Sequence, residues 1–71
     1  MSKEAVFAVF CLENYKLYRN MSGREAAKLF NDYGVFDYID EFYDVLHTTG
    51  HGYINKDIDI YLKSRGAAVP A

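Results

Sequence analysis

The sequence predicts an all-α protein, a small bundle of about four short helices. Apolar residues recur at helical spacing through most of the chain. Helix signals separate these stretches: a capping box, S-G-R-E, at residues 22–25, and glycines at positions 34 and 66 where the periodic stretches end. A chain of 71 residues has room for one domain. We place this single helical domain at residues 1–66 and a disordered tail at residues 67–71.

The first helix begins at Ser2, a good N-cap, with Glu4 in its first turn, where a carboxylate favours the helix dipole. It continues through V-F-A-V-F-C-L-E-N-Y-K-L-Y, residues 6–18. A buried strand would also fit the apolar start, but residues 13–20 continue it without a turn signal, which favours helix. The first half is apolar on every face, and such helices are usually buried on all sides. We therefore expect this helix to be buried.

The second helix follows the capping box, in which the Ser22 hydroxyl and the Glu25 carboxylate each bind a free backbone N–H. Its apolar positions recur at helical spacing: Ala26, Leu29, Phe30 and Tyr33. Gly34 then ends the helix as a left-handed C-cap.

The third helix is predicted over residues 35–47, as one continuous element. Its apolar stripe consists of Phe36, Ile39, Tyr43 and Leu46, with Phe42 and Val45 beside it. The opposite side carries Asp37, Asp40, Glu41 and Asp44, which we interpret as a solvated face. His47 falls in the last turn, where a donor can bind free carbonyl groups.

The last element, residues 53–66, has two interpretations. D-I-D-I-Y-L alternates like a strand, yet a lone strand would have no partner in a helical chain. Helical spacing fits Ile54, Ile58, Tyr61 and Leu62. Lys63 and Arg65 favour the negative end of a helix dipole, and Gly66 supplies a stop. The prediction is a helix.

Two histidines four residues apart, His47 and His51, raise the question of a metal site. Gly50 and Gly52 break the helix here, so the one-turn spacing of a zinc pair is lost. Only Cys11 adds a further ligand besides carboxylates. We therefore expect no metal and no cofactor.

A catalytic triad can also be written here, with Thr48 or Thr49 beside His47 and with Asp57 orienting the ring. No strained elbow or oxyanion nest accompanies it, so we expect no enzyme. The favoured interpretation is a structural latch, in which Asp57 lies in the first turn of the last helix and accepts a hydrogen bond from His47 or Thr48. Tyr53 and Ile54 would return to the core. The motif residues, structural or interacting, are Tyr43, Leu46, His47, Thr48, Gly50, Tyr53 and Asp57.

Charge and composition indicate the class of partner. The formal net charge is −2, from eight basic and ten acidic residues, so neither nucleic acid nor a membrane is expected as a partner. Hydrophobic residues make up 51% and aromatic residues 17%, more than so short a chain can easily bury. The surplus indicates an interface with another protein or a second copy, formed by Val6, Phe7, Val9 and Phe10. One cysteine and no secretory or membrane segment predict a cytoplasmic protein.

The stretch Y-D-V-L-H-T-T-G followed by Y-I-N-K-D-I-D-I-Y-L resembles the signature of a small bacterial family catalogued as domain of unknown function 3791. V-F-C-L-E-N-Y-K is similar to that family's first helix, and Gly52 departs from its pattern. The matching positions are Leu46, His47, Thr48, Gly50, Tyr53, Ile54, Asp57, Ile58, Tyr61 and Leu62. The resemblance implies a small cytoplasmic protein. It also implies an antitoxin-like or accessory role, because some members are encoded beside proteins that look like ADP-ribosyltransferase-type toxins.

The favoured function is therefore a small helical protein-interaction module, which binds a partner such as a toxin-like neighbour. The alternative is a DNA-binding regulator, because S-G-R-E-A-A-K-L-F resembles the opening helix of a helix-turn-helix domain. Against it, the next helix, at residues 35–46, is acidic. An enzyme or metal protein built on His47, His51 and Asp57 is a third, weaker hypothesis.

Overall fold

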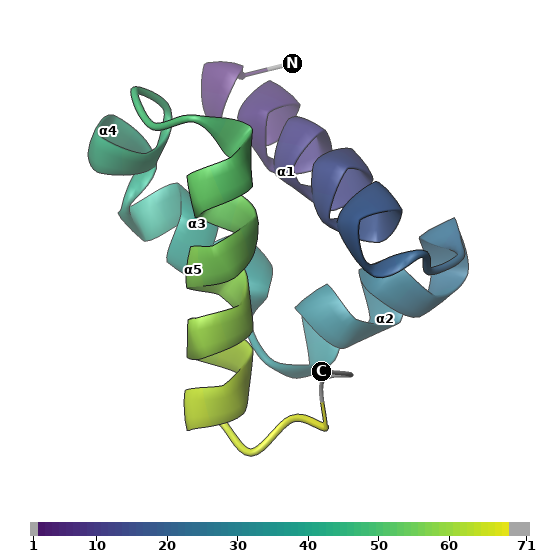
Figure 1. The fold of residues 1–71 in the computed structure, drawn as a ribbon. Helices are drawn as coiled ribbons and strands as arrows, with labels where there is room; N and C mark the ends of the chain where they lie inside the picture. Colours follow the sequence, from purple (N-terminus) through teal and green to yellow (C-terminus); the bar gives the residue numbers. More distant parts are fainter. Residues whose placement is uncertain (1, 69–71) are drawn as a thin grey trace.

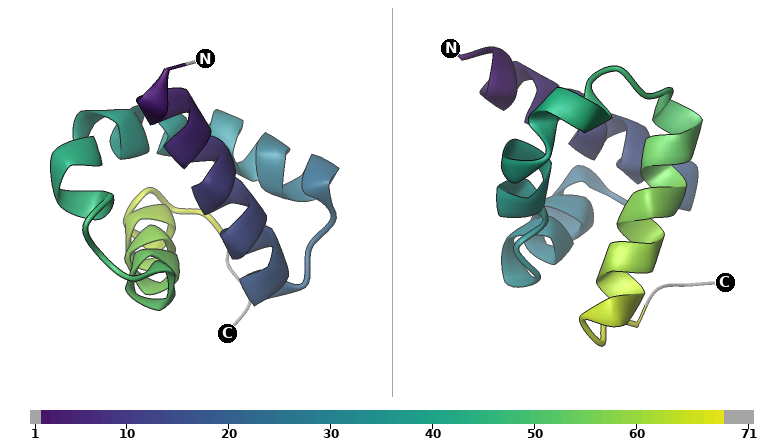
Figure 2. Two further views of the ribbon diagram at one scale, coloured as in Figure 1. Left: turned by 90° about the horizontal axis from the view of Figure 1, so that it is seen from above. Right: turned by 90° about the vertical axis from the view of Figure 1, so that its left-hand side faces the viewer.

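The computed structural model describes residues 2–68, which form five helices and no strand (Figure 1). These are α1 (Lys3–Arg19), α2 (Gly23–Asp32), α3 (Val35–Glu41), α4 (Tyr43–Leu46) and α5 (His51–Ser64). Helix α1 packs against α2, α3 and α5, and Figure 2 shows it lying across the top of the bundle. The prediction of a small all-α bundle is confirmed.

The helix boundaries follow the capping signals. The Ser2 hydroxyl accepts a hydrogen bond of 3.1 Å from a backbone N–H in the first turn of α1. The capping box is formed in both directions: the Glu25 N–H donates to the Ser22 hydroxyl at 3.1 Å, and the Ser22 N–H donates to the Glu25 carboxylate at 3.0 Å. Gly34 has φ of 68°, the left-handed conformation expected of it.

The core lies where α1, α2, α3 and α5 meet. Tyr15 of α1 and Phe30 of α2 are fully buried, and their ring centroids are 5.4 Å apart. The buried residues that pack together in this core are Cys11, Tyr15, Phe30, Val35, Ile39, Leu46, Ile54, Ile58, Leu62 and Ala67. Each helix therefore contributes at least one residue to a single core.

Helix α1 differs from the expectation that it would be buried on all sides. Only Cys11 and Tyr15 are buried along its length. Its exposed apolar side chains are Val6, Val9, Phe10, Leu17 and Tyr18. The reason is geometric, because α2, α3 and α5 pack against the side of α1 that carries Cys11 and Tyr15, and the opposite side stays exposed in the part of the chain that the structure describes.

The predicted third helix is two helices, because the chain changes direction at Phe42. This residue has φ of −103° and ψ of 22°, whereas an α-helix needs ψ near −42°. Helix α4 consequently projects away from α3, at the edge of the bundle (Figure 1). Phe42 and Val45 are exposed, while Leu46 still reaches the core with 5% exposure.

Helix α5 begins two residues earlier than predicted, with extended Gly50 as its N-cap and His51 as its first residue. Asp57 therefore lies in the second turn and not in the first. At the other end, Gly66 has φ of 85° and the Ala67 N–H donates to the Leu62 carbonyl at 3.0 Å, a Schellman motif.

The tail prediction for residues 67–71 is wrong at its first position. Ala67 is 8% exposed and belongs to the core, because the Schellman turn directs it back onto Leu62. Residues 69–71 lie outside the described residues. No helix in the described range is both long and apolar enough to cross a membrane.

Candidate protein-interaction site

The predicted latch has different partners from those expected. The ring nitrogen Nδ1 of His47 lies 2.7 Å from the Tyr43 carbonyl oxygen, and the two rings stack with centroids 4.5 Å apart. The same carbonyl also accepts the His47 backbone N–H at 2.9 Å, so it is not one of the free carbonyl groups that were expected as partners. Asp57 instead accepts a hydrogen bond of 2.5 Å from the Tyr38 hydroxyl. The expected bond from His47 or Thr48 to Asp57 is not formed.

The rest of the motif builds a corner. The hydroxyls of Thr48 and Thr49 donate to the Val45 carbonyl at 2.9 and 3.1 Å, so no threonine–histidine–aspartate triad is assembled. Ile54 is 2% exposed, as expected, but Tyr53 is 67% exposed and does not return to the core. Within residues 2–68, no three or more His, Cys, Asp or Glu side chains are grouped so that they could hold a metal ion.

A buried polar network that the sequence did not indicate joins α1 to α5. The Tyr15 hydroxyl donates to Asp59 Oδ1 at 2.6 Å. Arg19 donates from Nε to Asp59 Oδ1 at 3.1 Å and from Nη2 to Oδ2. Burial and the Asp59 carboxylate raise the pKa of the Tyr15 phenol above its ordinary range, and hydrogen bonding to Asp59 raises the pKa of Arg19. The Asp59 charge, 6% exposed, is thus paired on both oxygens.

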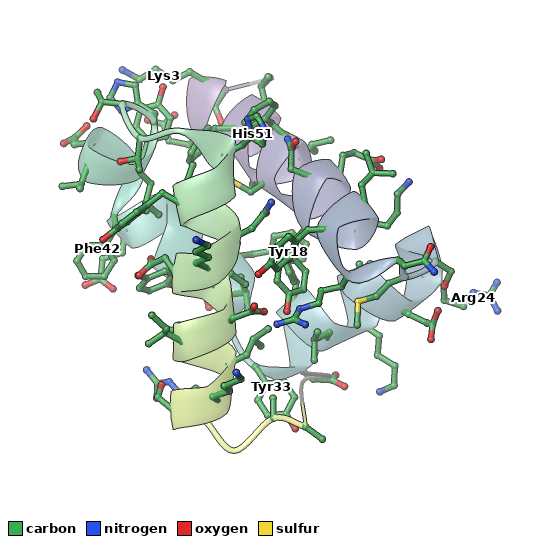
Figure 3. All side chains as sticks on the ribbon, viewed as in Figure 1. Lys3, Tyr18, Arg24, Tyr33, Phe42 and His51 are labelled. Atoms are coloured by element: carbon green, nitrogen blue, oxygen red, sulfur yellow. The ribbon has the colours of Figure 1, made fainter. Side chains whose placement is uncertain are left out.

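A groove opens between α1 and α5, and we call it the α1–α5 groove. Its lining residues are Asn14, Leu17, Tyr18, His51, Gly52 and Asn55. Figure 3 shows Tyr18 and His51 in the gap between the two helices. Asn55 is 5% exposed, and its Oδ1 is buried with no hydrogen-bond partner. Leu17 and Tyr18 are the apolar members of the lining, and the other four lining residues are polar residues or glycine.

The exposed side of α1 carries large apolar side chains beside this groove, with the exposed Glu13 between Phe10 and Leu17. We call it the α1 stripe: Val6, Val9, Phe10 and Leu17. Leu17, 75% exposed, belongs to both the stripe and the groove. Of the four predicted interface residues, Val6, Val9 and Phe10 are exposed. Phe7 is partly buried, with its ring edge-on to that of Tyr43 at 5.4 Å.

A second groove lies between α3 and α5 and has a different character. The Tyr38 and Tyr61 rings stack in it at 4.4 Å, and the Arg65 guanidinium lies 5.0 Å from the centroid of the Tyr61 ring. Asp37 and Glu41 line its rim. These two residues belong to α3, which follows α2 and would be the recognition helix of a helix-turn-helix domain. Its exposed carboxylates would repel phosphate, in contrast to a basic recognition helix.

The comparisons with known proteins identify a family and no described relative. A family model described as protein of unknown function (DUF3791) matches residues 6–65. Neither the curated proteins nor the solved structures contain a match to this chain. The matched range includes the α1–α5 groove, the whole α1 stripe and the whole corner around His47.

Proposed function

The chain belongs to the DUF3791 family of proteins of unknown function, and from this premise we propose that it is a small helical module that binds another protein through the α1 stripe. Because the family description assigns no activity, the proposal depends on the exposed apolar side chains of the α1 stripe. The finer proposal is an antitoxin-like or accessory partner of a toxin-like protein in the cytoplasm. The free Cys11 thiol, with no second cysteine, supports that location.

One observation carries the proposal: α1 exposes large apolar side chains that its own bundle does not need. Exposure is 54% for Val6, 51% for Val9 and 75% for Leu17. The core is closed by Cys11 and Tyr15 on the opposite side of the same helix. Several large apolar side chains exposed on one face of a small protein are typical of an interface, since their burial by a partner is favourable.

The partner is a different protein and not a second copy of this chain. Glu13 lies between Phe10 and Leu17 at helical spacing, so it falls within the stripe. Two-fold pairing of α1 stripes would bring the two Glu13 carboxylates near each other, which is unfavourable when the surrounding surface is desolvated. Glu13 already binds Lys16 at 2.7 Å, so a neutral or basic position on the partner fits opposite it.

Affinity capture with matched variants tests the proposal. Tagged wild-type chain, Leu17→Asp and Ile60→Asp are exposed to extract of the native host, and recovered proteins are measured by quantitative mass spectrometry. Leu17 and Ile60 are 75% and 67% exposed but lie on different helices, so Ile60→Asp controls for the added charge. We expect to recover a partner with wild type and with Ile60→Asp. With purified proteins, the affinity of Leu17→Asp for this partner should be at least about tenfold weaker than that of wild type.

Two results would contradict the proposal. One is equal recovery by both variants, since the stripe would then be dispensable. The other is a homodimer in light scattering that Leu17→Asp dissociates, because the stripe would then pair with a second copy. Urea denaturation of each variant confirms that lost binding is not lost folding.

A further inference from the structure

We infer that the second groove, between α3 and α5, binds an arginine side chain of a protein partner. We call it the α3–α5 groove. It is a cavity of about 640 Å³, and four of its eight lining residues are aromatic and two are acidic. No residue of α1 lines it, so this site is separate from the α1 stripe and goes beyond the proposed function.

The aromatic side chains of the groove are held in place before any partner arrives. The Tyr38 and Tyr61 centroids are 4.4 Å apart, and the Phe42 centroid lies 5.1 Å from that of Tyr38. The Tyr38 hydroxyl donates to Asp57, and the Tyr61 hydroxyl donates to the Tyr33 carbonyl at 3.0 Å. The Phe42 ring ends this series and is 44% exposed, and Figure 3 shows it at the outer edge of the bundle. A preformed surface of this kind costs little ordering on binding.

The two acidic lining residues, Asp37 and Glu41, favour a cation. They lie one turn apart on α3 and are exposed, and neither forms an ion pair or a side-chain hydrogen bond with the part of the chain that the structure describes. Like charges at this spacing destabilise a helix, so a cation beside both would relieve their repulsion. The basic lining residue, Arg65, pairs with neither of them, and the lining keeps a net charge of −1 from two acidic residues and one basic residue.

The combination of rings and carboxylates selects a guanidinium among cations. A guanidinium is planar, stacks on aromatic faces and presents five N–H donors that carboxylates accept in pairs. The chain itself shows the first of these contacts, since the Arg65 guanidinium lies 5.0 Å from the centroid of the Tyr61 ring. A lysine ammonium is more strongly hydrated and cannot stack. A metal ion needs more ligands, and no group of three or more His, Cys, Asp or Glu side chains within residues 2–68 could hold one.

The open rim of the groove favours a side chain of a protein over a free small molecule. Asp37, Glu41 and Phe42 are all exposed, whereas small-molecule sites usually cover most of the surface of their ligand. Arginine is enriched at protein–protein interfaces, where the rest of the partner supplies further contact area. Its guanidinium would lie against the Phe42 ring, with donors directed at the two carboxylates.

Short peptides test this chemistry. The tripeptide glycine–arginine–glycine, blocked at both ends, is titrated into the isotope-labelled full chain, and the ring signals of Phe42 and Tyr61 are followed by NMR. A matched peptide carries citrulline, which has nearly the shape of arginine and no charge, and another carries lysine. We expect saturable shifts with the arginine peptide. The citrulline and lysine peptides should each bind at least about fivefold more weakly.

Variants locate the binding site. Asp37→Asn combined with Glu41→Gln removes both lining charges, and we expect the arginine peptide to bind at least about fivefold more weakly. Asp40→Asn combined with Asp44→Asn is the matched control, because it removes two exposed charges that do not line the groove and should bind within about twofold of wild type. Phe42→Leu keeps an apolar side chain without the ring and should weaken binding about threefold. Circular dichroism verifies that each variant is folded.

Four outcomes overturn the inference. They are no saturable shift with the arginine peptide, equal binding of the citrulline or lysine peptide, equal losses in the two double variants, and unchanged binding by Phe42→Leu. Tighter binding of free arginine than of the blocked peptide also contradicts it, since the groove would then be a small-molecule site. The proposed function fails or stands separately, because Leu17→Asp should bind the arginine peptide as wild type does.

Discussion

Tyr15 and Asp59 are 44 residues apart in the sequence and share a hydrogen bond of 2.6 Å that joins α1 to α5. Arg19, one turn further along α1, binds the same carboxylate. These two helices also form the walls of the α1–α5 groove. The buried network therefore fixes the geometry of the candidate site as well as holding the bundle together.

Removing the shared carboxylate should be far more damaging than removing one hydroxyl. Asp59→Ala removes the carboxylate that both the Tyr15 hydroxyl and the Arg19 guanidinium bind, and we expect a loss of about 3 kcal/mol or more in unfolding free energy. Tyr15→Phe removes one bond to a charged group and should cost about 1.5–3 kcal/mol. Urea denaturation followed by circular dichroism measures both, with exposed Asp40→Ala as the control. An Asp59→Ala variant as stable as the control would contradict this account.

The pairing of Tyr38 with Asp57 replaces the predicted latch and should show energetic coupling. Tyr38→Phe and Asp57→Ala each remove the same 2.5 Å hydrogen bond, so the double variant should lose less stability than the sum of the single variants. We expect a coupling of about 1 kcal/mol. His47→Ala, which removes an exposed and local contact, should cost less than about 0.5 kcal/mol. Strictly additive effects would contradict the coupling of Tyr38 to Asp57. A large loss of stability in His47→Ala would mean that His47 holds the corner, as the predicted latch required.

Tyr38 also predicts a loss of stability at alkaline pH. Burial and the Asp57 hydrogen bond raise the pKa of Tyr38 from 10.0 to about 12. The folded state holds the Tyr38 hydroxyl proton more tightly than the unfolded chain does. The resulting contribution of Tyr38 to the unfolding free energy is therefore fully present below pH 10. It is lost as pH rises through about 12. Urea denaturation between pH 9 and 12 should show a smaller loss for Tyr38→Phe than for wild type. If the unfolding free energy of both proteins falls equally with pH, Tyr38 is not the source of the alkaline loss of stability.

Much of the fold was predictable because its signals are local. Ser22 and Glu25 cap a helix through neighbouring atoms, and Gly34 and Gly66 adopt the left-handed conformations that glycine tolerates. The helical spacing of Ile54, Ile58 and Leu62 likewise decides between helix and strand, because all three are buried on one face.

The errors concern effects that depend on tertiary structure. No glycine or proline marks the change of direction at Phe42, so the split of the third helix has no sequence signal. Asp59 and Asp57 occur in the same alternating run, and only the packed bundle assigns one to Tyr15 and Arg19 and the other to Tyr38. The α1–α5 groove was missed for the same reason, since its lining residues come from two helices that are far apart in the sequence.

Cys11 should be protected from thiol reagents by the core of a single chain. It is 1% exposed, and burial raises the pKa of its thiol to about 11. At pH 8 we expect its labelling by a disulfide reagent to be at least about a hundredfold slower than in the urea-unfolded chain. A Cys11→Ser, Leu17→Cys double variant is the control, because its thiol lies at an exposed position and should react fast. Fast labelling of folded wild type would place Cys11 outside the core.

The buried Asn55 should lower the unfolding free energy of the protein relative to an apolar residue at the same position. Asn55→Leu removes a buried acceptor that has no partner and fills similar space with apolar atoms, so unfolding free energy should rise by about 1–3 kcal/mol. Urea denaturation of this variant beside Asn31→Leu, at an exposed asparagine, measures the difference. A destabilised Asn55→Leu would mean that the amide contributes to the fold itself.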